Sequence, residues 1–261
     1  MCLSSKVRDL RDTLLQNCDE AISRLRIFEQ SIIIKVPQSS DKQPEASSSR
    51  TSPSDPSTNT TSSTLPAEAI NVTTTDPKIA NDYMVLTHGV LIQEWEHFLY
   101  DIFIEGVIYY LKGDNLGDPD HKLRLKSLKP TVEEAERRKN ISAEVKNAKS
   151  LWGKELFTQC RKLFKVPETE LLKEMQKQEQ VRHVFQHNRG IIRKEDLVAI
   201  GTSGVTAHFD ILNDKEETVQ YYEKQSIVLS KKEIQKLRDT VVKYSQLFQT
   251  QAENCEKYSL T

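Results

Sequence analysis

The chain has 261 residues, 37% hydrophobic and 29% charged, with a formal net charge of −1. This length allows one domain of roughly 150–200 residues plus a tail, and the charge excludes a polybasic nucleic-acid coat or an acidic tail. The charged start lacks the apolar core of a secretory signal, and four carboxylates interrupt the most apolar stretch, residues 83–111. We therefore expect a cytoplasmic protein without a membrane partner, whose four widely spaced cysteines are reduced thiols.

The first expected element is a helix over residues 5–34, where apolar residues recur at three- and four-residue steps. Residues 36–77 are rich in Ser, Thr and Pro and bury too little to repay their ordering entropy, which predicts a long disordered tether. The expected organisation is an N-terminal helix within residues 1–35, this tether, and a helical body over residues 78–261. The first helix then either packs back on the body across the tether or acts separately.

The body is predicted to be mostly helical. A long helix over residues 79–112 ends at Gly113, and Thr131 opens a capping box for the next helix. The remaining expected elements are a helix from Pro167 to Gly190, a hairpin of 205–212 with 218–229, and a final helix opened by the capping box Ser230-Lys-Lys-Glu. The predicted fold class is all-α, a helical bundle with a small β-hairpin appendage.

Charge is uneven along the body. Residues 121–194 hold 19 Lys and Arg against 9 Asp and Glu. A basic segment of this kind suits a partner that carries phosphates. Equally, these charges form a solvated helix face and pair with the acidic residues of 79–120. The sequence leaves both interpretations open.

One group of polar residues stands out at the end of the helix before Gly190, which is expected to be its left-handed cap. An arginine fixes a phosphate through its planar fork and a histidine moves protons, so Arg182 and His187 together suit phosphodiester cleavage. Residues five apart on a helix point about 140° away from each other. Arg182 and His187 therefore meet only if the helix distorts, the arginine reaches around, or two copies of the chain face each other.

Simpler interpretations of the same residues remain. His183 and His187 share a helix face and could hold a metal, but the glutamate of a zinc-protease motif and a third ligand are missing, so no metal or other cofactor is expected. Asn188 and Gly190 are also typical of plain helix termination.

The segment Arg182-His-Val-Phe-Gln-His187 fits the Arg-(polar)-x-x-x-His signature of the HEPN superfamily (higher eukaryote and prokaryote nucleotide-binding). The following Asn-Arg-Gly-Ile-Ile, residues 188–192, resembles the sequence after the motif in several stand-alone prokaryotic HEPN families. Residues 93–103, Gln-Glu-Trp-Glu-His-Phe-Leu-Tyr-Asp-Ile-Phe, look like the apolar helix with embedded carboxylates of these families. The resemblance covers roughly residues 78–258.

The resemblance implies a HEPN-like bundle that forms a homodimer, with both motifs lining one cleft. Catalytically active members are metal-independent endoribonucleases, often toxins or antiviral defence effectors with a partner antitoxin, and inactive members bind nucleic acid or nucleotides. The helix over 79–112 also has more apolar surface than a small body needs, which further favours a dimer. One subfamily carries a modified Tyr two residues after the histidine, and Arg189 stands there in this chain.

Chemistry and resemblance together assign the roles. His187 would move a proton at the ribose 2′-hydroxyl or the leaving 5′-oxygen, Arg182 would hold the scissile phosphate, and His183 would orient the site. Asn188 would fix His187 or cap the helix. Arg189, Arg193 and Lys194 would bind flanking RNA phosphates, or they form a plain solvated loop. Glu94 and Glu96 would orient Arg182, unless one of them faces solvent beside Trp95.

The predicted function is thus a metal-independent endoribonuclease that cleaves single-stranded RNA by attack of the 2′-hydroxyl. The alternative is a non-catalytic module for RNA binding, nucleotide binding or assembly.

Overall fold

The computed structural model describes residues 2–31, 77–113, 115–117, 133–147, 153–201 and 207–259. This part is mostly helical and contains seven helices and one two-stranded antiparallel sheet, as the sequence predicts for the secondary structure. In chain order the elements are α1 (Leu3–Ser31), α2 (Pro77–Leu111), α3 (Glu134–Asn147), α4 (Lys154–Phe164), α5 (Glu170–Asn188), α6 (Lys194–Ala199), β1 (Phe209–Leu212), β2 (Thr218–Tyr221) and α7 (Lys231–Ser259).

Helix α2 is the centre of the bundle. It contacts α1, α3, α4, α5 and α7, and its apolar residues are buried on several sides, as expected for a helix that is hydrophobic all round. Trp95 is fully buried, with its ring 5.5 Å from that of Phe157 on α4 and 5.8 Å from that of Tyr244 on α7. Most of the apolar surface of α2 is therefore used inside one chain, so the apolar character of this helix does not by itself require a dimer.

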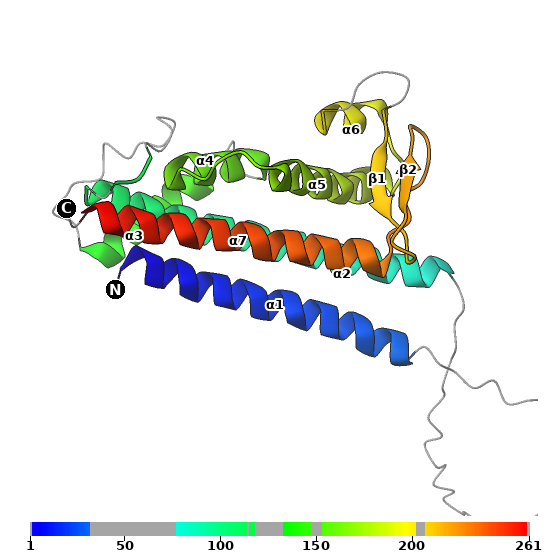
Figure 1. Cartoon of the computed structure of the whole chain (residues 1–261), viewed down its shortest axis with the longest axis horizontal. Helices are drawn as coiled ribbons and strands as arrows, with labels where there is room; N and C mark the ends of the chain where they lie inside the picture. Colours follow the sequence, from blue (N-terminus) through cyan, green and yellow to red (C-terminus); the bar gives the residue numbers. More distant parts are fainter. Residues whose placement is uncertain are drawn as a thin grey trace, which may run out of the picture.

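Helix α1 belongs to the same body. Figure 1 shows it running along α2 and α7, and its residues Val7, Leu14 and Cys18 are buried in the common core. Asn17 Nδ2 donates a hydrogen bond of 2.7 Å to Glu94 Oε2 on α2, which adds a polar tie to the apolar contact. Of the two alternatives for the first helix, the structure has the packed one. The predicted tether lies outside the described residues, apart from the first residue of α2.

The predicted hairpin is present in a shorter form. Strands β1 and β2 pair antiparallel, with Phe209 opposite Tyr221 and Leu212 opposite Thr218. The chain beyond β2 returns to the end of α5, where the Ile227 amide donates to the Gly190 carbonyl over 2.9 Å. The hairpin thus supports the end of α5, where the predicted site lies. Thr131 and the first two residues predicted for the hairpin fall outside the described residues.

A buried polar network joins α2, α5 and α7. The Glu233 amide donates to Ser230 Oγ over 3.1 Å, which is one half of the predicted capping box. The Glu233 carboxylate, expected to complete the box, instead accepts from the Leu212 amide at 2.8 Å and pairs with Lys177 Nζ at 2.9 Å among the described residues. Gln178 also donates to Glu233, and it accepts a bond of 2.8 Å from His88 Nε2. Burial lowers the pKa of His88 to about 4, so this histidine is a neutral donor.

Candidate functional site

The site lies at the carboxyl end of α5, and the way this helix ends determines where its last side chains stand. Arg189 takes the first left-handed position (φ 54°) and Gly190 the second (φ 83°), and the Gly190 amide donates to the Val184 carbonyl over 3.1 Å. Gly190 was predicted as the left-handed cap, and it shares that conformation with Arg189. A Cβ at residue 190 would stand 2.9 Å from the Phe185 ring, so close packing also requires glycine here.

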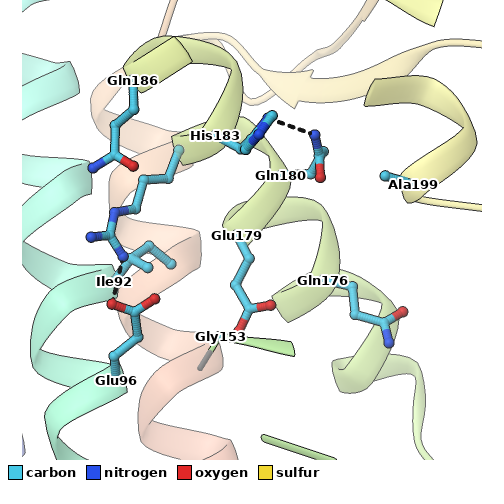
Figure 2. A pocket seen from close by; sticks show the side chains of 10 residues that line it. Ile92, Glu96, Gly153, Gln176, Glu179, Gln180, His183, Gln186 and Ala199 are labelled. Atoms are coloured by element: carbon cyan, nitrogen blue, oxygen red, sulfur yellow. Dashed lines mark hydrogen bonds and ion pairs between the residues drawn. The ribbon is translucent and has the colours of Figure 1, made fainter. Parts of the chain in front are cut away.

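A pocket of about 320 Å³ opens beside α5 (Figure 2). It is lined by Ile92, Glu96, Gly153, Gln176, Glu179, Gln180, Arg182, His183, Gln186 and Ala199. Arg182 Nη1 donates to Glu96 Oε2 over 2.7 Å, and the two side chains are 21% and 25% exposed. Of the two carboxylates predicted to orient Arg182, Glu96 contacts it, whereas Glu94 bonds Asn17 on the other side of α2.

Arg182 has hydrogen-bonding capacity left. Its Nε is buried and has no hydrogen-bond acceptor among the described residues. An arginine has five N–H groups, and its planar fork binds an oxyanion through two of them. Glu96 therefore fixes the guanidinium in the pocket while donors remain for a ligand.

Two histidines lie near the end of the same helix. The His183 ring lines the pocket, and its centroid lies 4.6 Å from that of His187. His187 is exposed and does not line the pocket. One chain thus brings His183 together with His187 and places Arg182 and His183 in the lining of one pocket. His187 does not line the pocket with Arg182, as their five-residue spacing predicts.

A buried carboxylate that no sequence motif indicates lies beside His183. Asp196 on α6 is 2% exposed and accepts hydrogen bonds from Gln180 Nε2 at 2.8 Å, Asn188 Nδ2 at 2.9 Å and the Arg193 amide at 2.8 Å. Its Oδ1 also lies 3.3 Å from His183 Nδ1. Asp196 is the third residue of α6, but Arg193 at the N-cap is not a typical capping residue, so no motif marks it. Asn188 therefore bonds Asp196, and no bond from it to His187 is found in the described part.

The outer basic residues and the rest of the charged segment behave differently. Arg189, Arg193 and Lys194 are exposed around the end of α5 and the start of α6. By contrast, Arg138 pairs with Glu105 of α2, which also pairs with Lys6 of α1, a residue outside the basic segment. Part of the basic segment is therefore paired with acidic residues of 79–120. This pairing is what the second interpretation, a solvated helix face, predicts.

No family model matches the chain, and neither the curated proteins nor the solved structures give a significant match. Within the described ranges, no three His, Cys, Asp or Glu side chains are grouped so that they could hold a metal ion. No helix in that part of the chain is long and apolar enough to cross a bilayer.

Proposed function

We propose that this chain is a HEPN-like endoribonuclease that cleaves single-stranded RNA without a metal ion. The observation that carries the proposal is the grouping at the end of α5. Arg182 is held by Glu96 at the wall of a pocket, and His183, which lines the same pocket, contacts His187. A fixed cation for a phosphate and two groups that transfer protons are the parts that such a cleavage requires.

The chemistry follows from these parts. One imidazole removes the proton of the ribose 2′-hydroxyl, and the 2′-oxygen forms a bond to phosphorus. The bond from phosphorus to the 5′-oxygen breaks, and an imidazolium donates a proton to that oxygen. The products are a 2′,3′-cyclic phosphate and a 5′-hydroxyl, and Arg182 stabilises the charge that develops on the phosphate.

The site is expected to be completed by a second copy of the chain, because Arg182 and His187 do not line one pocket in a single chain. Two large apolar side chains near the site are exposed to solvent, Ile191 at 48% and Val198 at 58%. A symmetric interface over these residues would bring the two α5 ends together around one RNA strand.

The proposal is tested by incubating the purified protein with single-stranded RNA in EDTA and identifying the product ends. Wild type should give 2′,3′-cyclic phosphates and leave DNA of the same sequence intact, because DNA lacks the attacking hydroxyl. Arg182→Ala should lower the rate by roughly 100-fold, since one preorganised group at a developing charge contributes a few kcal/mol. His187→Ala should abolish cleavage.

The matched control is Arg238→Ala, which removes another partly exposed arginine in an ion pair, with Asp19 at 2.6 Å, on the side of the bundle where α7 meets α1. This variant should cleave at the wild-type rate. Equal loss in Arg182→Ala and Arg238→Ala would trace the effect to stability. If the wild-type protein binds RNA without cleaving it, the proposed enzymatic function is overturned and the non-catalytic binding module is favoured.

A further inference from the structure

Asp196 is the most enclosed charged group at the junction of α5 and α6, and its two oxygens face different partners. Oδ2 accepts from the Arg193 amide and from Asn188 Nδ2, which ties the start of α6 to the end of α5. Oδ1 faces Gln180 and His183, two residues that line the pocket. The bonds of Oδ2 explain how α6 is joined to α5, whereas Oδ1 lies toward the pocket.

The hydrogen positions around Oδ1 follow from its neighbours. Gln180 Nε2 lies 2.8 Å from Oδ1 and 3.2 Å from His183 Nδ1, so its better bond is to the carboxylate. His183 Nδ1 lies 3.3 Å from the same oxygen. A carboxylate oxygen only accepts, so a hydrogen on Nδ1 makes this contact attractive, whereas a bare Nδ1 would set two lone pairs against each other.

We infer that Asp196 is a positioning residue that holds His183 in the tautomer with hydrogen on Nδ1, which makes Nε2 the proton acceptor in the pocket that Arg182 also lines. The inference rests on the proposed function for the use of that acceptor. His187 on α5 and Asp196 on α6 contact His183, and the other charged groups that line the pocket are Arg182 and Glu179 on α5 and Glu96 on α2. Among these, Asp196 is the carboxylate placed to accept from the ring.

The inference also divides the two histidines by role. With Nδ1 bound to Asp196, the Nε2 lone pair of His183 takes the proton of the 2′-hydroxyl while the 2′-oxygen bonds to phosphorus. His187, whose ring is in contact with His183, is left to donate the proton to the 5′-oxygen. One chain then carries both groups of the proton transfer, and the expected second copy brings the two α5 ends together around one RNA strand.

The test measures the tautomer directly. In two-bond ¹H–¹⁵N spectra of the neutral ring, wild-type His183 should show a protonated Nδ1 and a bare Nε2. In Asp196→Asn, the amide oxygen should stay on the Arg193 amide, because that backbone donor is fixed, and the new NH₂ should then face His183. A donor in this place requires a bare Nδ1, so the ring should change to the Nε2–H form.

Two controls separate positioning from stability. Ser230→Ala removes the N-cap of α7, a contact with Glu233 that is not part of the pocket, and should leave the His183 tautomer unchanged. Gln180→Ala removes the competing donor and should also keep the hydrogen on Nδ1. A wild-type ring protonated on Nε2, or the same tautomer in wild type and Asp196→Asn, overturns the inference.

Cleavage assays on the same samples keep the two proposals apart. Asp196→Asn should lower the cleavage rate by about 100-fold, within the usual effect of a general base. A changed tautomer with an unchanged rate overturns the role of His183 as the proton acceptor. Absence of cleavage by wild type, with hydrogen on Nδ1, overturns the proposed function and supports Asp196 as the residue that positions His183.

Discussion

Replacement of Gly190 by alanine is expected to destabilise the protein, because two separate features of the structure require glycine there. The residue has a φ of 83°, and a non-glycine residue in left-handed conformation costs about 1–2 kcal/mol. The new Cβ would also stand 2.9 Å from Phe185 Cε1 and 3.2 Å from Cδ1, so the half-buried ring must move. We expect a total loss of about 1–3 kcal/mol, or roughly 3–10 °C in the midpoint of thermal unfolding.

The chain offers a control with the opposite sign. Gly89 is in helix α2, and a Cβ added there meets no atom within 4 Å. Gly89→Ala should therefore raise stability by up to about 1 kcal/mol through helix propensity alone. Urea and thermal unfolding followed by circular dichroism measure both variants. A Gly190→Ala protein as stable as wild type, or a Gly89→Ala protein that loses stability, would refute this account of the helix end.

Three further predictions follow from the buried network and the exposed surface. The pKa of His88 is about 4 in the folded protein and 6.5 for the free group, so between pH 6.5 and 4 the unfolded chain binds more protons than the folded chain. The free energy of unfolding therefore falls as the pH drops from 6.5 to 4, by up to about 3 kcal/mol. Urea unfolding at several pH values should show this slope in wild type and a smaller one in His88→Gln. Lys177→Met leaves the Glu233 carboxylate buried without its cation and should lower the free energy of unfolding by about 3–5 kcal/mol, and adding Glu233→Gln should recover part of the loss. For the proposed homodimer, Val198→Glu should raise the dissociation constant at least tenfold in light scattering, whereas Leu86→Glu, at an equally exposed apolar residue of α2, should leave it unchanged.

The sequence predicts most of the helices because their apolar residues are numerous and regular. The expected helix over 79–112 appears as Pro77–Leu111, and the helix expected to begin near Pro167 appears as Glu170–Asn188. Helix α6 was missed, since six residues with two buried side chains carry no measurable periodicity. The hairpin was recognised from alternation and turn residues, but its pairing is shorter than the alternation suggests.

The site was predicted less completely for a different reason. Local spacing correctly places His183 beside His187, because residues four apart share a helix face. The contact of Arg182 with Glu96 joins residues far apart in the chain, and the sequence offered Glu94 and Glu96 as equal candidates. Asp196 was missed because its partners come from α5 and from the loop between α5 and α6, so only the fold-back of the chain collects them.

Polar contacts of two different kinds join helix α5 to α2, and the difference bears on how the proposed site works. Gln178 bonds His88 and Glu233 inside the core, where water does not reach, so this contact fixes the rotation of the helix. Arg182, four residues later and therefore on the same face, bonds Glu96 at a pocket wall that solvent reaches. In the proposed function, the phosphate bonds the donors of Arg182 that Glu96 leaves free, while Glu96 holds the guanidinium and Gln178 keeps the helix in place.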